Sequence, residues 1–189
     1  MSRIGILGGA FDPPQVGHVA LARTAIDHFD LSRLLVRVIE NPGHKGVDTP
    51  SAIRLFLAEL AFAPFDEAEV ALDRHSRTVS SLEALGLKDP VFLIGADQLV
   101  DFLSWTEPER VLELARLGVA TRPGFTLEAL ESVLRELPRP ERVELFSMDP
   151  LAVSSSEIKE RIRAGRSVEE MLPRAVAAEI DRLGLYRAP

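Results

Sequence analysis

Apolar residues gather in short runs along the chain, and segments with helical spacing of apolar residues separate these runs. The runs are apolar nearly throughout and do not alternate cleanly with polar residues, which is typical of strands buried on both faces. The predicted strands span residues 3–7, 33–39, 68–73, 90–96, 116–121 and 142–148. The predicted helices between them span residues 18–29, 51–62, 78–85, 108–114 and 126–137. This alternation predicts an α/β fold with a Rossmann-like, doubly wound parallel sheet and helices on both faces.

After the last predicted strand the pattern changes to two helices with no strand between them. They lie in the segments "VSSSEIKERIRAG" and "PRAVAAEIDRLGLY". Ser155 or Ser156 is the expected N-cap of the first helix, and Gly165 is its expected stop. Pro173 suits the first position of the second helix. The chain therefore ends in a helical C-terminal extension.

The composition fits a single domain with a sizeable core, because 46% of the 189 residues are apolar. We expect one domain over residues 1–189, with the α/β core at 1–150 and the helical part at 151–189. The net charge of −7 argues against a nucleic-acid partner, which needs a broad basic face. The chain has no cysteine, no run long enough to span a membrane and no visible signal peptide. We expect a cytoplasmic protein. The sequence does not determine whether it forms a homo-oligomer.

The crossing from the first predicted strand to the first predicted helix reads "GGAFDPPQVGH", from Gly8 to His18. Ligands of open parallel sheets bind at the carboxyl ends of strands. Gly8 and Gly9 let the backbone approach a ligand closely, and the N–H groups at the helix start near His18 favour an anion. The segment is neither G-x-G-x-x-G nor a Walker loop, which disfavours a dehydrogenase. We interpret the crossing as a phosphate site.

This crossing resembles the G-G-[TS]-F-D-P-x-H-x-G-H signature of the nucleotidyltransferase superfamily, in the form found in nicotinate mononucleotide adenylyltransferases. Other segments resemble further signatures of that family in the same order, so the resemblance covers essentially the whole chain. They are "NPGHKG" with the later Arg54, "HSRTVSSLEAL", "FLIGADQLVDFLSW", "ATRPG" and "VSSSEIKERIRAG". The resemblance implies an enzyme of NAD biosynthesis. Its reaction transfers the adenylyl group of ATP to nicotinate mononucleotide, giving nicotinate adenine dinucleotide and pyrophosphate.

The resemblance also implies the residues of the site. His18 and Lys159 would be the catalytic residues, acting on the phosphates of ATP. The set implied to bind ATP is Gly8, Gly9, Ala10, Phe11, Gln15, Gly17, His18, Ser155, Ser156 and Lys159. The set implied to bind the mononucleotide is His44, Lys45, Thr78, Asp97, Trp105 and Arg122. Mg²⁺ is expected to be bound through the ATP phosphates, with no metal site of the protein's own. Asp12 is expected to order its loop through backbone hydrogen bonds.

Four positions depart from the family pattern: Gln15 replaces a histidine, Ala10 a threonine or serine, Lys159 an arginine, and Arg77 a tyrosine or tryptophan. Gln15 offers a neutral donor where an imidazolium could carry charge, and Lys159 lacks the planar fork of arginine. Arg77 adds a cation near the implied pyridine pocket, which favours nicotinate over nicotinamide if the side chain points inward. The alternatives are an adenylyltransferase for nicotinamide mononucleotide or another phosphorylated acceptor, and a nucleotide-binding homologue with weak or no turnover.

Overall fold

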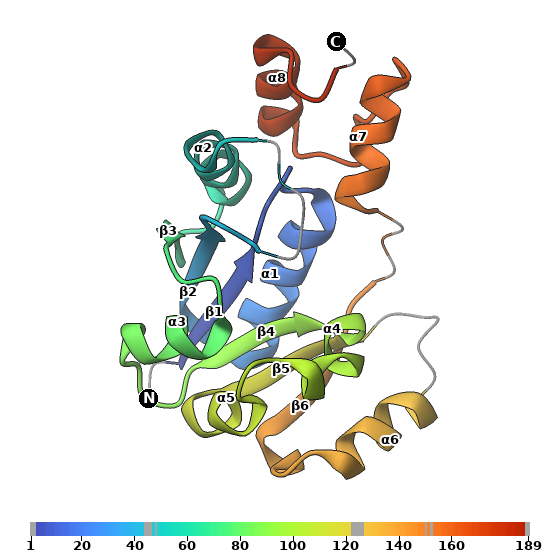
Figure 1. Cartoon of the computed structure of the whole chain (residues 1–189). Coiled ribbons are helices and arrows are strands. Elements are labelled where there is room, and N and C mark those ends of the chain that lie inside the picture. The colour runs from blue at the N-terminus through green and yellow to red at the C-terminus, as the bar shows by residue number, and fades with distance from the viewer. Residues whose placement is uncertain are drawn as a thin grey trace.

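A computed structural model of the chain describes residues 3–43, 47, 49–121, 127–149, 151 and 153–187. Its strands are β1 (Arg3–Gly9), β2 (Leu31–Ile39), β3 (Ala68–Asp73), β4 (Val91–Gly95), β5 (Arg116–Thr121) and β6 (Val143–Ser147). They form one six-stranded sheet in the order β3-β2-β1-β4-β5-β6, and every neighbouring pair is parallel (Figure 1). This order is that of a Rossmann fold, so the predicted fold class is confirmed.

The helices are α1 (Val16–Phe29), α2 (Ser51–Phe62), α3 (Thr78–Leu85), α4 (Ala96–Val100), α5 (Pro108–Leu114), α6 (Leu127–Glu136), α7 (Ser155–Arg163) and α8 (Arg174–Leu183). Short 3₁₀ turns lie at Phe102–Ser104 and Pro140–Arg142. The helices predicted from the sequence are all present with small shifts at their ends. The short helix α4 was not predicted, because its five residues directly follow the apolar run of β4 and offer little helical periodicity of their own.

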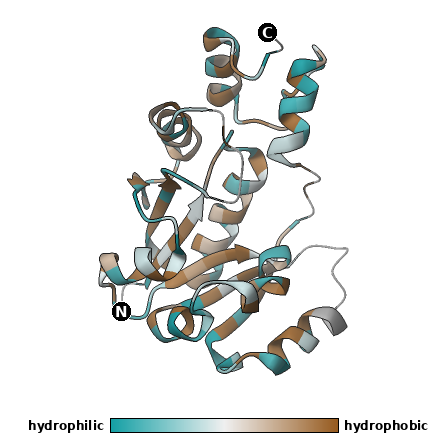
Figure 2. Cartoon of the chain, in the orientation of Figure 1, coloured by the Kyte–Doolittle hydropathy of each residue, from teal (hydrophilic) through white to brown (hydrophobic). Residues whose placement is uncertain are grey.

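The sheet has an apolar core on each face. Leu7 and Leu93 belong to a cluster with the buried side chains of α1 and α2, whereas their neighbours Ile6 and Phe92 belong to a cluster with those of α3, α5 and α6. Successive strand residues point to opposite faces, so a strand covered on both sides needs apolar residues throughout. Figure 2 shows hydrophobic colour along the strands of the sheet and a mixture of hydrophobic and hydrophilic residues on the flanking helices.

The start of α7 differs from the prediction. Ser154 is the N-cap, in place of Ser155 or Ser156: its backbone is extended (φ −135°) and its hydroxyl accepts a hydrogen bond from the Glu157 N–H (3.1 Å). Only a residue outside the helical φ/ψ region can aim its side chain at these N–H groups, and Ser154 is the last serine before the helical residues. Gly165 follows the helix with φ 64°, as expected of a helix stop.

The C-terminal helices share the core of the α/β part. Ile158 of α7 and Val176 and Ile180 of α8 are buried in the same cluster as the residues of α1 and α2. Pro173 is the N-cap of α8, one position before the predicted one. None of the helices within the described ranges is both long and apolar enough to cross a membrane.

Candidate active site

The starts of α1 and α7 lie next to each other at the carboxyl end of β1 (Figure 1). Gln15 is the N-cap of α1, and its side-chain amide donates a hydrogen bond to the Val153 carbonyl (3.4 Å), directly before the N-cap of α7. The Ser155 hydroxyl donates to the Pro13 carbonyl (3.1 Å). Two helix N-termini, each with a positive dipole end, therefore converge beside the β1–α1 loop (residues 10–14). β1 also borders the point where the strand order reverses, which is the usual ligand crevice of such sheets.

His18 is oriented by the first turn of α1. Its Nδ1 accepts a hydrogen bond from the backbone N–H of Gln15 (3.1 Å), and its ring makes an edge contact with Phe11 (5.0 Å between centroids). In the neutral imidazole this contact leaves the proton on Nε2. His18 can therefore donate a hydrogen bond from Nε2 to an anion.

Gln15 is engaged in capping. Its Oε1 accepts a hydrogen bond from the Gly17 N–H, while its amide nitrogen reaches Val153. A Cβ at Gly17 would lie 2.5 Å from that Oε1, so a larger residue at position 17 would displace the Gln15 amide from this position. The prediction that Gln15 contacts phosphate stays untested. The structure gives its side chain a second role, which is to join the starts of the two helices.

Arg54, on α2, holds the β1–α1 loop from the other side. It is 1% exposed, and its guanidinium donates to four backbone carbonyls. They belong to Ala10 (2.7 Å), Ile39 (2.8 Å), Glu40 (2.8 Å) and Thr49 (3.0 Å). Burial lowers the pKa of Arg54, and the Asp12 carboxylate opposes that shift. The guanidinium thus ties the ends of β1 and β2 together beneath the loop.

Asp12 interacts with side chains, where backbone hydrogen bonds were expected. Its Oδ2 forms an ion pair with Lys159 Nζ, and its Oδ1 accepts a hydrogen bond from the Tyr186 hydroxyl (2.7 Å). Lys159 lies on α7 and Tyr186 in the segment after α8. Both partners are far from Asp12 in the sequence, so the sequence does not reveal these contacts. Lys159, which is predicted to bind phosphates, therefore lies at the β1–α1 loop, where its ammonium group forms an ion pair with Asp12.

A second group of predicted residues gathers near Trp105. Thr78 is the first residue of α3, and Arg77 before it donates a side-chain hydrogen bond to Thr106, the neighbour of Trp105. The Trp105 ring is half-buried and contacts Phe102 (5.2 Å between centroids). The structure thus brings Thr78, Arg77 and Trp105 together, and Arg77 reaches across toward the tryptophan segment.

Phe92 links this group to the end of β1. Its ring makes an edge contact with Trp105 (6.3 Å between centroids) and lies 3.6 Å from the position of a Cβ at Gly8. Gly8 and Gly9 end β1, and Gly95 ends the neighbouring β4. Asp97, in the first turn of α4, is exposed close to that strand end. Both sets of predicted residues therefore lie at the same edge of the sheet.

Some of the predicted site residues lie outside the described part of the chain, and others differ from one another in their exposure. His44, Lys45 and Arg122 lie outside the described residues. Phe11 as a whole is 2% exposed, and its ring packs against His18 and Phe62. Ser156 is exposed in the first turn of α7. In the part of the chain that the structure describes, no three His, Asp or Glu side chains gather in a way that could hold a metal ion.

Sequence reasoning did not include Arg54, Asp12 or Tyr186 among the site residues. The match of Arg54 to the family pattern does not reveal its structural role, and its position on a helix rich in apolar residues is the signal of its burial. Asp12 and Tyr186 gave no signal of pairing, because 174 residues separate them.

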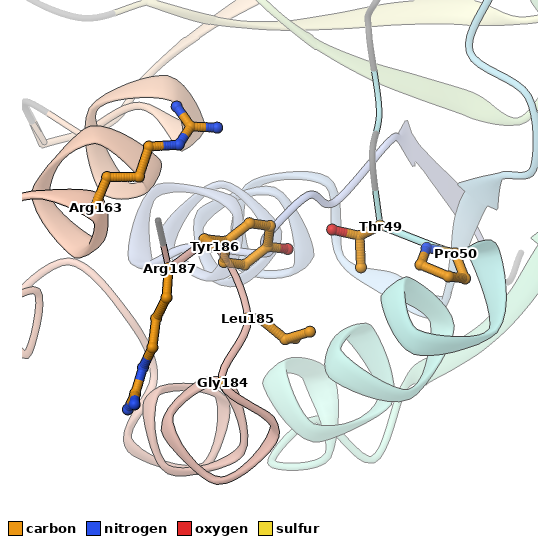
Figure 3. Close-up of a pocket in the computed structure, with 7 residues that line it drawn as sticks. All are labelled: Thr49, Pro50, Arg163, Gly184, Leu185, Tyr186 and Arg187. Carbon is orange, nitrogen blue, oxygen red and sulfur yellow. The ribbon is translucent and has the colours of Figure 1, made fainter. Parts of the chain in front are cut away.

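A pocket of about 320 Å³ lies between the start of α2, the end of α7 and the segment after α8 (Figure 3). It is lined by Thr49 and Pro50, by Arg163 at the end of α7, and by residues 184–187. It contains no residue of the predicted substrate sets. Tyr186 is the residue shared by this pocket and the Asp12 contact, since its ring forms a wall and its hydroxyl reaches Asp12.

Comparison with known proteins shows the family to which the chain belongs. A sequence model of the cytidylyltransferase-like family matches residues 6–161, which include the β1–α1 loop and the start of α7. The "Probable nicotinate-nucleotide adenylyltransferase" of Thermus thermophilus is 41% identical over 194 residues, covering 98% of this chain and 100% of the relative. That of Thermomicrobium roseum is 36% identical over 199 residues, covering 99% and 92%. The chain belongs to the nicotinate-nucleotide adenylyltransferase family.

Solved structures agree on the fold. The nicotinic acid mononucleotide adenylyltransferase of Plasmodium falciparum complexed with NaAD has a TM-score of 0.80 at 18% identity, covering 98% of each chain. The same enzyme complexed with APC has a TM-score of 0.78. At this level of identity the match confirms the Rossmann-like architecture of the chain.

Proposed function

We propose that the protein transfers the adenylyl group of ATP to nicotinate mononucleotide, releasing pyrophosphate and forming nicotinate adenine dinucleotide for NAD biosynthesis. Family membership supports the reaction, and the observation that carries it in this chain is the hydrogen bond from Gln15 to Val153. That bond places the N-termini of α1 and α7 side by side, which suits a triphosphate. The proposed site of action is the cytoplasm, as expected from the sequence.

In the proposed reaction a phosphate oxygen of the mononucleotide attacks the α-phosphorus of ATP. The bond from that phosphorus to the bridging oxygen breaks, and pyrophosphate leaves with both electrons. No covalent enzyme intermediate is needed, so the protein acts by positioning two anions and stabilising charge on the leaving group. Mg²⁺ would be carried by the phosphates, as is usual for this cation with nucleotides, and would neutralise part of their charge.

His18 is proposed to donate from Nε2 to the phosphates as negative charge develops there. The backbone N–H groups of Gly9 and Ala10 are proposed to face the same anion, as the family pattern implies. The start of α7 would hold the β- and γ-phosphates through backbone N–H groups and the exposed Ser156 hydroxyl. Lys159 would supply positive charge one turn further along.

The acceptor is proposed to bind between α3 and the Trp105 segment. Trp105 would stack on the pyridine ring, with Thr78 beside it and Asp97 near the ribose. Arg77 reaches this segment through Thr106, which supports a carboxylated pyridine over an uncharged amide. His44, Lys45 and Arg122 are proposed to contact the mononucleotide, as the family pattern implies.

Trp105 is the only tryptophan, so its fluorescence reports directly on the proposed acceptor pocket. Nicotinate mononucleotide is expected to quench this fluorescence saturably, because the pyridine ring would stack on the indole. Nicotinamide mononucleotide is expected to bind about tenfold more weakly, since it lacks the carboxylate that Arg77 would contact. Fluorescence titration with each mononucleotide measures both affinities.

The variant Arg77→Gln should bring the two affinities close together, whereas Arg74→Gln, at an exposed neighbour in the same loop, should not. If neither mononucleotide changes the fluorescence, the acceptor does not bind at Trp105. If the wild-type protein binds both equally, Arg77 does not discriminate between them.

A further inference from the structure

Asp12 connects the β1–α1 loop to the C-terminal segment of the chain. It is 4% exposed, and each carboxylate oxygen meets one donor from that segment. Lys159 of α7 pairs with Oδ2, and the Tyr186 hydroxyl donates to Oδ1 at 2.7 Å. These partners lie 147 and 174 residues further along the chain. A buried carboxylate needs such partners, because desolvation without them is costly.

Tyr186 is aimed at Asp12 by the way α8 ends. Gly184 adopts φ 62°, and the Leu185 N–H donates to the Ile180 carbonyl (3.0 Å), which turns the chain back toward α7. Tyr186 itself has φ 62°, a left-handed conformation that a residue with a large side chain seldom adopts. Its side-chain contacts therefore hold the backbone in this conformation. Figure 3 shows the ring lying between Arg163 and Thr49.

The Tyr186 ring also contacts the partner of Asp12. Lys159 Nζ lies 5.4 Å from the ring centroid, within the range of a cation–π interaction. Burial raises the pKa of the Tyr186 hydroxyl well above its usual value; a hydrogen bond with the Thr49 side chain opposes that shift, and the hydrogen bond to Asp12 adds to it. The hydroxyl therefore remains a donor to Asp12 throughout the neutral range.

We infer that Tyr186 is a positioning residue for ATP binding: it holds the Asp12 carboxylate, and through it the β1–α1 loop and the Lys159 ammonium. This inference rests on the proposed function. Without the hydroxyl, Oδ1 of Asp12 loses its donor, and the carboxylate can turn further toward Lys159. The ammonium is then drawn away from the phosphates, and the loop shifts with Asp12.

Other contacts would keep the loop folded in the absence of that hydroxyl. Arg54 holds the Ala10 carbonyl and Ser155 holds the Pro13 carbonyl, and neither contact involves Tyr186. The proposed acceptor pocket at Trp105 packs against the opposite core of the sheet. Loss of the hydroxyl is therefore expected to weaken ATP binding without affecting the acceptor.

The variant Tyr186→Phe tests this inference, because it removes the hydroxyl and keeps the ring. We expect the dissociation constant for a non-hydrolysable ATP analogue with Mg²⁺, measured by calorimetry, to rise about tenfold. The dissociation constant for nicotinate mononucleotide, measured by Trp105 fluorescence, should stay within about twofold. The thermal unfolding midpoint should fall by no more than about 4 °C. The matched control Arg187→Ala changes the exposed neighbouring residue and should leave both affinities unchanged.

Tyr186 is also the only tyrosine, so the near-ultraviolet absorbance of phenolate reports its ionisation alone. In the wild-type protein this ionisation should begin only at a pH well above that of a free tyrosine. Normal ionisation would mean that the hydroxyl is not held by Asp12, and it would overturn the inference.

Three binding results would also overturn the inference. Unchanged ATP affinity in Tyr186→Phe would mean that the hydroxyl contributes only to the stability of the fold. Equal weakening of both substrates would indicate a general loss of structure. Failure of the wild-type protein to bind the ATP analogue would remove both this inference and the proposed function. If ATP binds as expected but no pyrophosphate is released, only the proposed function fails.

Discussion

Replacing His18 with alanine is expected to lower the rate of pyrophosphate release by about a hundredfold to a thousandfold. The contact of Nδ1 with the Gln15 N–H directs Nε2 as a donor, so the variant loses one oriented hydrogen bond to the leaving phosphates. Such a donor acts mainly on charge that develops in the transition state, so kcat should fall far more than the KM for ATP rises. Steady-state kinetics with ATP, Mg²⁺ and nicotinate mononucleotide measures both constants.

His28 provides the matched control for this variant. It lies at the other end of α1, where it pairs with Glu144 on the surface (3.0 Å). His28→Gln should leave kcat within about twofold of the wild-type value, because surface pairs of this kind contribute little. A His18→Ala variant with normal kcat would show that the phosphates do not bind at the start of α1.

Replacing Arg54 with methionine is expected to lower the free energy of unfolding by about 3–5 kcal/mol. The variant leaves four backbone carbonyls without their common donor and removes the cation that faces Asp12. Methionine keeps an unbranched apolar stem but lacks the guanidinium group, so part of the effect comes from lost volume. Urea unfolding followed by circular dichroism measures the change.

The control for Arg54 is an arginine whose charge is exposed. Arg33→Met breaks a surface ion pair with Glu69 (2.6 Å), and it should cost about 1 kcal/mol or less. A similarly small cost for Arg54→Met would mean that the ends of β1 and β2 are held by other contacts. Any active fraction of Arg54→Met should also show weaker ATP binding, because the Ala10 carbonyl is released.

The fold could be predicted from the sequence because its signal is local. Each central strand is covered on both faces and must be apolar throughout, and each helix shows its own periodicity. The helix α4 was missed because one turn of helix carries too few residues for a pattern. The N-cap of α7 was misplaced because three consecutive serines have similar capping propensity, and only the backbone of Ser154 distinguishes them.

The site could be predicted only where its residues lie close together in the sequence. The β1–α1 crossing pointed to His18, and the serine run pointed to the start of α7. The sequence could not reveal that Gln15 joins the two helix starts, because that contact spans 138 residues. Likewise, Arg54 is held beneath the loop by backbone carbonyls at the ends of two strands. Every residue has a backbone carbonyl, so the sequence does not show which of them accept hydrogen bonds from Arg54.

This chain is proposed to join ATP and nicotinate mononucleotide into a dinucleotide, with release of pyrophosphate. Incubating the protein with both substrates and Mg²⁺, and identifying the products by mass spectrometry, tests that reaction. Nicotinate adenine dinucleotide and pyrophosphate should form in equal amounts, with much less product from nicotinamide mononucleotide. Clear ATP binding with no dinucleotide from nicotinate mononucleotide would contradict the proposal.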